Sequence, residues 1–482
     1  MEGLLLASTY VRNMVADIAL CTDFYELTMA AAYHRLDYET SRKISRKKNA
    51  IFEMFVRKLP RNRSYMVVAG LEQAIFFLTK MRFNNRHISY IKSLKVFKDV
   101  GQDFFEYLKR FKFTGTVWAV PEGTILFPNE PIIRIEAPLI EAQIVETYLL
   151  SMINFQSLIA TKASRIVSAS KGKPIIEFGS RRAHGPQAGV LAARASYIGG
   201  CMGTSNTLAG YKLRIPLFGT MAHSFVMSFD KEEEAFKEFN SLFPSGYLLV
   251  DTYDTLSAIK KIIDAGIHTS GIRLDSGDPY YQSIEARRLL DSAGHFSTKI
   301  MISGDLNEYL IRDLVNRDAP IDYFGVGTEL STSRDDPAMN GVYKLVGIRS
   351  HTQSPSDVKK KYIDNHNDRI LYKIKTSPGK KTYPGPKQIH RLIENNMIKE
   401  DVISLEDEKM ISGYLHVPLL RKFLENGKIL CKMPSVEEIQ RHHSQQVNLL
   451  PPKFKDLDFV PEAFPVIYSE KLQAMMNQFN RG

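Results

Sequence analysis

The chain has 482 residues, of which 44% are hydrophobic and 24% charged, and its formal net charge is +11. These proportions are typical of a soluble globular protein, and the length allows two or three domains. The positive charge favours acidic partners, with nucleic acid and phosphorylated metabolites as the two serious options. Only three cysteines occur, widely separated, which argues against a disulfide framework and a zinc site.

The first residues carry one short apolar run and lack the basic start and long apolar stretch of a secretory signal. No apolar run elsewhere approaches the roughly 18 residues that a membrane-spanning helix needs. We therefore expect a cytoplasmic protein without a membrane partner.

The first third of the chain alternates helix and strand signals. Helical spacing over residues 18–40, with Thr22-Asp23 as a cap, is followed by a basic loop at 41–49 and a strand at 51–57. Alternation with period two between 114 and 136 predicts a small antiparallel unit, and residues 141–170 read as a long helix.

The middle of the chain contains five short apolar runs that each end in a polar, glycine-bearing or acidic cluster. Such runs are typical of buried parallel strands, whose C-terminal ends carry the chemistry in α/β folds. The last four strand ends fall at 250, 274, 302 and 324, so they are separated by 24, 28 and 22 residues, the length of a strand plus a crossover helix. The runs are 174–178, 247–250, 271–274, 299–302 and 322–324.

This repetition predicts an α/β fold built on an irregular TIM-like β/α barrel, with its site at the C-terminal ends of the strands. We expect the barrel to occupy residues 156–349. Residues 1–155 form an N-terminal α+β domain in this interpretation, and residues 350–482 return to it.

Two glycine-rich strand ends are candidates for phosphate binding. Gly325-Val326-Gly327-Thr328 offers closely spaced backbone N–H groups where a helix begins, although such a pair of glycines also makes an ordinary tight turn. Gly304, after the preceding strand, would place a second amide-rich loop beside the first. The third glycine of a dinucleotide-binding fingerprint is absent.

The segment from Arg273 to Asp278 is the densest in charge. Arg273 and Asp275 share a face of a strand, so both can point into the mouth of the barrel. An arginine fork binds phosphate, and the aspartates suit ribose hydroxyls or a magnesium ion, for which Asp278 is the candidate ligand. The alternative is a structural ion pair at the rim.

Three further clusters are ambiguous on their own. The acidic cluster at 251–254 is suited to binding ribose hydroxyls, or it simply marks the end of a strand. The arginines at 181–182 either bind an anion or belong to a solvated loop. His223 lies among apolar residues, where a histidine is usually structural, yet neutral imidazole is a competent nucleophile at physiological pH.

Together these clusters resemble the nicotinate phosphoribosyltransferase family, over a stretch from near residue 20 to beyond residue 390. The motifs that carry the resemblance are Thr22–Met29, Glu177–Arg182, Gly203–Gly210, Gly219–Ser224, Leu249–Thr255, Ile272–Asp278, Ile302–Asp305, Phe324–Thr328 and Tyr383–Arg391.

The resemblance implies a reaction between nicotinate and phosphoribosyl pyrophosphate that gives nicotinate mononucleotide and pyrophosphate, the first step of NAD salvage from nicotinate. It also implies coupled ATP hydrolysis through a phosphorylated histidine, which by motif is His223. Mg²⁺ would be the cofactor, ATP and phosphoribosyl pyrophosphate the co-substrates, and the enzyme an ATP-dependent ligase. The family is generally dimeric, so a homodimer with shared active sites is expected, without nucleic acid.

The same resemblance assigns roles to individual residues. Tyr25 of a second subunit and Phe178 would sandwich the pyridine ring, and Arg181 would face nicotinate and the pyrophosphate. Arg273 and Asp275 would position ribose and phosphates. The 5′-phosphate would lie on Gly304, Gly325 and Gly327, and further substrate contacts would come from Gly219, Ser224 and Thr328.

Asn206 bears on the choice of pyridine. The related nicotinamide enzyme has an aspartate at this place, and an anion facing the carboxylate of nicotinate would repel it, whereas an amide can donate a hydrogen bond. This favours nicotinate. Transfer to nicotinamide or quinolinate is the nearest alternative, and a basic nucleic-acid-binding protein without activity is the alternative from another class. The chain shows no basic stripe interleaved with aromatic residues, which argues against the latter.

Overall fold

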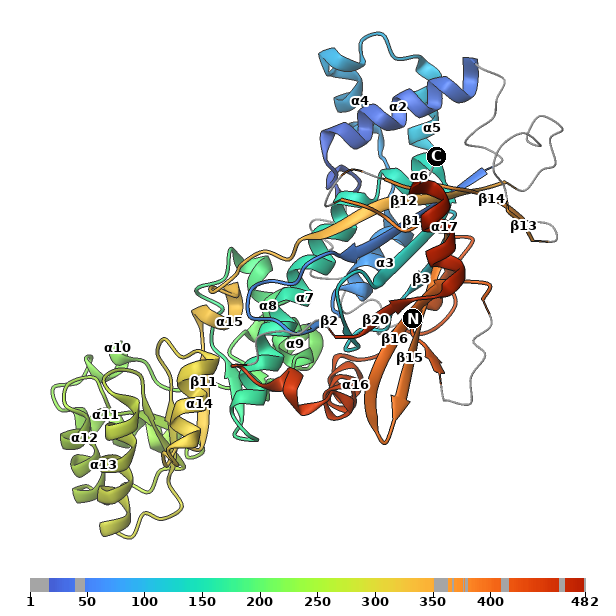
Figure 1. Cartoon of the computed structure of the whole chain (residues 1–482). Coiled ribbons are helices and arrows are strands. Elements are labelled where there is room, and N and C mark those ends of the chain that lie inside the picture. The colour runs from blue at the N-terminus through green and yellow to red at the C-terminus, as the bar shows by residue number, and fades with distance from the viewer. Residues whose placement is uncertain are drawn as a thin grey trace.

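The computed structural model describes residues 17–39, 48–350, 363–365, 368–375, 377, 380–408, 416–458 and 464–480. Most of the basic loop expected at 41–49 lies outside these residues. The fold consists of an antiparallel unit, which includes both the earliest and the latest described segments, and a parallel unit formed by the middle of the chain (Figure 1).

The antiparallel unit is organised around an eight-stranded sheet. Its order is β13-β14-β12-β1-β5-β3-β18-β19, so three strands from before the parallel unit form its centre and strands from after the parallel unit flank them on both sides. Its strands are β1 (Lys48–Val56), β3 (Thr116–Ala119), β5 (Pro131–Pro138), β12 (Gly341–Ser350), β13 (Ile363–Asn365), β14 (Asp368–Tyr372), β18 (Arg421–Glu425) and β19 (Lys428–Ile429).

Helices and two smaller sheets surround this sheet. In Figure 1, α2, α4 and α5 lie at the top, and β15, β16 and α16 lie at the lower right. The helices are α2 (Phe24–Glu39), α3 (Leu71–Lys80), α4 (Asn85–Ser93), α5 (Gln102–Lys109), α6 (Leu139–Gln143), α16 (Val436–Leu449) and α17 (Glu470–Asn480). The short sheets comprise β2 (Met66–Val67), β4 (Ile125–Leu126), β15 (Lys387–Glu394), β16 (Met397–Leu405), β17 (His416–Pro418) and β20 (Val466–Tyr468). A second α+β domain built from N-terminal and C-terminal segments is thus confirmed, while the domain boundaries after residues 155 and 349 stay predictions.

The parallel unit contains a six-stranded sheet in the order β7-β6-β11-β10-β9-β8, with every neighbouring pair parallel. Its strands are β6 (Ile175–Glu177), β7 (Gly203–Thr204), β8 (Tyr247–Leu249), β9 (Gly271–Leu274), β10 (Lys299–Ile302) and β11 (Tyr323–Val326). Its helices are α8 (Pro186–Ile198), α9 (Thr207–Leu213), α10 (His223–Val226), α11 (Glu232–Leu242), α12 (Thr255–Asp264), α13 (Pro279–Ser292), α14 (Glu308–Asn316) and α15 (Thr328–Thr332).

The strand-and-helix alternation predicted from the apolar runs is confirmed, because β8, β9, β10 and β11 end within two residues of the predicted positions. Most of their side chains are buried, against one another and against the crossover helices, which is why the runs are largely apolar. Arg273 is the exception within β9, and it is only partly buried. The barrel is irregular, since the hydrogen-bonded ladder has six strands and no pairing joins its edge strands β7 and β8 in the described part of the chain.

Helix α7 (Glu146–Ala169) contacts both units, packing on α3 and β2 of the first and on α8 and α14 of the second. Its Lys162 is 1% exposed and donates to three carboxylates, of Glu308 at 2.6 Å, Asp335 at 3.0 Å and Glu329 at 3.3 Å. Asp335 also pairs with Arg63 from the first unit at 2.8 Å. This buried ionic network ties the antiparallel unit to the rim of the parallel sheet.

Among the described residues, no helix combines the length and the apolar character that crossing a bilayer requires.

Candidate active site

The residues singled out from the sequence follow strands that are direct neighbours. In the parallel ladder Ile302 of β10 pairs with both Leu274 of β9 and Phe324 of β11, and Val326 of β11 pairs with Glu177 of β6. Since all four strands run in the same direction, the loops after them meet at one edge of the sheet. That edge is the candidate active site.

Arg273 is the centre of the hydrogen bonding at this edge. Its Nε donates to Ser303 Oγ at 2.7 Å, its Nη1 to Thr220 Oγ1 at 2.8 Å and its Nη2 to Asp275 Oδ1 at 2.6 Å. The guanidinium also lies over the ring of Phe178, with Cζ 5.6 Å from the ring centroid. The side chain thereby connects four loops and places one cation against the flat face of an aromatic ring.

Asp275 faces Arg273 on one side and His223 on the other. Burial alone would raise its pKa, but hydrogen bonds from Ser303 and Arg273, together with the positive charge of Arg273, hold the pKa of Asp275 below its usual value. Its second oxygen lies 3.9 Å from His223 Nε2. The carboxylate is therefore ionised at neutral pH and shared between a cation and the imidazole.

His223 is the first residue of α10, and its side chain is 43% exposed. The other ring nitrogen, Nδ1, is hydrogen-bonded to Thr252 Oγ1 at 3.2 Å. The imidazole is thus held on one side and open to solvent on the other, an arrangement suited to a reacting group rather than a core histidine.

Asp251, at the end of β8, supports the loop after β9. Its Oδ2 accepts the backbone N–H of Asp275 at 3.0 Å and the hydroxyl of Ser276 at 2.6 Å. Its Oδ1 is buried without a hydrogen-bond partner. Within the acidic cluster at 251–254, whose role the sequence left undecided, Asp251 is thus structural: it holds Asp275 in place.

Phe178, which follows β6, packs tightly against β11, the neighbouring strand in the sheet. Its backbone N–H donates to Val326 O at 2.8 Å, and a Cβ on Gly325 would overlap the Phe178 ring. Glu177, just before it, is fully buried and accepts from Thr204 Oγ1 at 2.5 Å and from the N–H of Gly179. Burial raises the pKa of Glu177.

The glycines predicted to bind phosphate have steric requirements as well. Gly304 adopts φ +89°, a region that favours glycine, and a Cβ there would overlap the carbonyl oxygen of Asp275. Gly327 meets only ordinary contacts, the nearest being Phe178 O at 3.4 Å, and Thr328 begins α15. Gly304 and Gly325 are therefore required by packing, whether or not they also touch phosphate.

Asp278, the candidate magnesium ligand, caps a helix. Its Oδ1 accepts the backbone N–H groups of Tyr280 at 2.9 Å and Tyr281 at 3.0 Å at the start of α13. Among the described residues, no cluster of three or more histidines, cysteines or carboxylates could hold a metal ion. A magnesium ion here would depend on oxygens of the substrate as well as on protein carboxylates.

Asn206 caps α9 through its side-chain oxygen, which accepts from Ala209 N at 2.9 Å, and this leaves the Nδ2 group as a potential donor. Arg181 is exposed and forms no ion pair within the described residues, so its charge is available to a ligand. Gly219 and Ser224 flank the His223 turn and are also exposed.

Tyr25 is the predicted site residue that the chain does not bring to this edge. It lies on α2, at the top of Figure 1, while β11 and the candidate site lie at the lower left. Its hydroxyl donates to Glu146 at 3.0 Å, and burial together with this carboxylate raises the pKa of Tyr25. Tyr25 is 46% exposed.

Two hydroxyl side chains at this edge, Thr220 and Ser303, were not assigned a role from the sequence, although each directly neighbours a glycine that was. Asp251 and Thr252 belong to the acidic cluster at 251–254, which the sequence left undecided.

Comparison with known proteins agrees with this geometry. Profiles of the nicotinate phosphoribosyltransferase N-terminal domain, family and C-terminal domain match residues 20–154, 174–376 and 409–476. The nicotinate phosphoribosyltransferase pncB2 of Mycobacterium tuberculosis (strain ATCC 25618 / H37Rv) is 40% identical over 94% of this chain and 92% of its own. The nicotinate phosphoribosyltransferase of Bacillus subtilis (strain 168) is 38% identical, over 94% and 93%.

A crystal structure of human nicotinic acid phosphoribosyltransferase has a similar fold, with a TM-score of 0.78 and 26% sequence identity. The similarity covers 95% of this chain and 99% of the human one. Because both units and the strand-end motifs are matched along nearly the whole length, the chain belongs to the nicotinate phosphoribosyltransferase family.

Proposed function

We propose that the protein transfers the phosphoribosyl group of phosphoribosyl pyrophosphate to nicotinate, forming nicotinate mononucleotide and pyrophosphate with coupled hydrolysis of ATP. The observation that carries this proposal is Arg273, which touches Asp275, Ser303 and the face of Phe178 at once. Family membership supplies the substrate class, since the relatives are named for this reaction.

The chemistry required is mainly positioning and charge stabilisation. The C1–O bond to pyrophosphate breaks, the ring nitrogen of nicotinate bonds to C1, and the negative charge leaves with pyrophosphate. Arg273 lies where it can stabilise that charge, while Phe178 offers a flat surface for the pyridine ring. The ionised Asp275 suits the ribose hydroxyls or the oxocarbenium-like transition state.

Mg²⁺ is part of the proposal as a counter-ion to the diphosphate. Protein-bound magnesium commonly keeps one or two carboxylates and takes its other ligands from phosphates and water. Asp275 and the second oxygen of Asp278 fit that donor set. When bound, the ion would neutralise charge on the leaving group.

His223 is the proposed site of ATP coupling. Its Nε2 would attack the terminal phosphorus of ATP, the bond to the ADP oxygen would break, and water would later hydrolyse the phosphohistidine to phosphate. The exposed imidazole held by Thr252 supports this role. The protein is further proposed to be an ATP-dependent ligase in the cytoplasm and a homodimer in which Tyr25 of the second subunit completes the pyridine site.

Asn206 supports nicotinate over nicotinamide, because its free Nδ2 can donate to the pyridine carboxylate. The test is competition among nicotinate, nicotinamide and quinolinate with phosphoribosyl pyrophosphate, magnesium and ATP. We expect nicotinate to be consumed preferentially, and equal or faster use of nicotinamide would overturn the substrate assignment.

The ATP step is tested separately with His223→Ala. This variant should lose ATP hydrolysis and its stimulation of transfer, while retaining slow transfer without ATP. Unchanged coupling would refute the phosphohistidine and leave the transferase assignment intact.

A further inference from the structure

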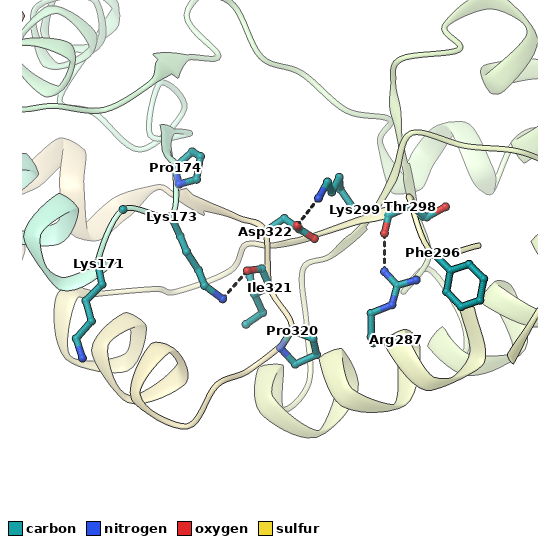
Figure 2. A pocket seen from close by; sticks show the side chains of 11 residues that line it. Lys171, Lys173, Pro174, Arg287, Phe296, Thr298, Lys299, Pro320, Ile321 and Asp322 are labelled. Carbon is teal, nitrogen blue, oxygen red and sulfur yellow. Dashed lines mark hydrogen bonds and ion pairs between the residues drawn. The ribbon is translucent and has the colours of Figure 1, made fainter. Parts of the chain in front are cut away.

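A cavity opens at the opposite edge of the parallel sheet, where its strands begin. It has a volume of about 650 Å³ and lies among segments that precede β6, β10 and β11, together with α13 (Figure 2). Its lining includes four cationic side chains and one carboxylate, from Lys171, Lys173, Arg287, Lys299 and Asp322.

Two of the four cations are neutralised by neighbouring carboxylates. Lys299 pairs with Asp322 at 2.9 Å, and Arg287 pairs with Asp291 at 2.8 Å while its guanidinium also donates to the carbonyls of Thr298 and His295. These contacts join α13 and the segment before β11 to the start of β10, and they need no ligand to explain them.

The other two cations have no carboxylate partner within the described residues. Lys173 is half-buried and donates to two backbone carbonyls, of Ile321 at 2.7 Å and Ala319 at 3.0 Å. An ammonium group has three donors, so one N–H remains for a ligand. Lys171 is exposed at the same rim. Two positive charges are thus left uncompensated beside a cavity, one of them partly removed from water.

The same cavity has an apolar wall. Phe296 is 74% exposed, and Pro174 and Pro320 also line the pocket. In Figure 2, Lys171 and Lys173 lie on one side of the pocket and Phe296 on the other. A ligand that satisfies both sides carries a dianionic group at one end and a flat ring at the other.

We propose that this pocket binds a phosphorylated small molecule of the mononucleotide class. Its phosphate pairs with Lys171 and Lys173, and its base stacks on Phe296. The cavity volume is in the range of small-molecule sites. A phosphate monoester supplies the negative charge with which the two lysines can pair.

The pocket is separate from the candidate active site. Strands β6, β10 and β11 each have three or four residues, which at about 3.3 Å per residue places their two ends roughly 10–13 Å apart. One phosphate cannot contact both edges. The proposal therefore does not depend on the catalytic role of Arg273 or His223.

The experiment measures binding of inorganic phosphate and of AMP by calorimetry, and locates it by amide hydrogen exchange on the full-length protein. Binding should slow exchange in segments 171–174 and 319–322. AMP should bind about tenfold more tightly than phosphate, and Phe296→Ala should abolish that difference. Titrations in Arg273→Met, which weakens anion binding at the opposite edge, isolate the contribution of this pocket.

Charge variants provide the decisive comparison. Lys173→Met should weaken phosphate binding about tenfold or more, and Lys171→Met should weaken it severalfold without disturbing the fold, since that side chain is exposed. Lys260→Met, an exposed lysine on α12 away from the pocket, is the matched control and should bind as the unmodified protein does. Equal affinity in all three variants, or exchange protection confined to the loops after the strands, would overturn the proposal. AMP binding no tighter than phosphate would refute the nucleotide class.

Discussion

The Nδ1 of His223 lies 3.2 Å from Thr252 Oγ1, and the Nε2 of the same ring faces Asp275 at 3.9 Å. When Nδ1 carries the proton and donates it to the threonine hydroxyl, Nε2 keeps its lone pair. In that tautomer, Thr252 holds the imidazole so that the nitrogen beside Asp275 is the one free to react.

We expect Thr252→Val to lower ATP-stimulated transfer about fivefold, the effect of losing one neutral hydrogen bond worth about 1 kcal/mol. Transfer without ATP should change little. Thr252→Ser keeps the hydroxyl and should restore most of the stimulation. Steady-state rates with and without ATP measure the effect, and a Ser variant as impaired as the Val variant would point to packing instead.

Gly325→Ala should displace the Phe178 ring, because the added Cβ has no room beside it. Such overpacking typically costs about 1–3 kcal/mol of stability, and here it should also raise the KM for nicotinate. Phe178→Leu removes the ring from this contact. In that background the alanine should cost less, and an unchanged cost in a double-mutant cycle would show that the two residues are not coupled.

Lys162→Met should destabilise the protein by about 3–5 kcal/mol, because it leaves the fully buried Glu308 with Arg165, at 3.3 Å, as its one charged partner among the described residues. Adding Glu308→Gln removes the uncompensated charge and should recover part of the loss. Denaturant midpoints of the two variants and the unmodified protein give the comparison. A double variant less stable than Lys162→Met alone would contradict the expectation.

His443 makes the protein sensitive to acid. It is fully buried between Gly123 O at 3.2 Å and Ser164 Oγ at 3.0 Å, and burial lowers its pKa from 6.5 to about 4. Because the unfolded chain binds the proton more readily, the contribution of His443 to stability is present above pH 6.5 and is lost as the pH falls toward 4. The loss amounts to about 3 kcal/mol at most.

His443→Gln cannot take up this proton, so its unfolding free energy should fall less between pH 7 and pH 4.5 than that of the unmodified protein. Urea unfolding at the two pH values measures the difference. An identical pH dependence in the two proteins would show that other groups dominate acid sensitivity.

The parallel strands could be predicted because burial on both faces leaves a continuous apolar run, as in Leu248–Val250 and Ile300–Ile302. The sequence also carries a signal for the role of Asp278 as a helix cap, since an aspartate directly before a proline, here Pro279, is a typical helix start. We instead interpreted Asp278 as a metal ligand.

The packing of Gly325 against Phe178 could not be predicted, because it depends on β6 and β11 becoming neighbours although they are far apart in the chain. The hydrogen bond from Arg273 to Thr220 could not be predicted either, because no sequence pattern indicates that these two segments lie side by side. The clustering of charged residues after the strands could be inferred from the sequence. Which group pairs with each charge could be identified only from the fold.

The strand order of the large sheet has a consequence for synthesis on the ribosome. Strand β1 lies between β5 and β12, and β3 lies between β5 and β18, so both outer partners emerge only after the whole parallel unit has been translated. Until then the three early strands have two unpaired edges, which are prone to association with other chains. The nascent protein is therefore vulnerable to aggregation throughout the translation of its parallel unit, and pairing with β12 begins to close this interval.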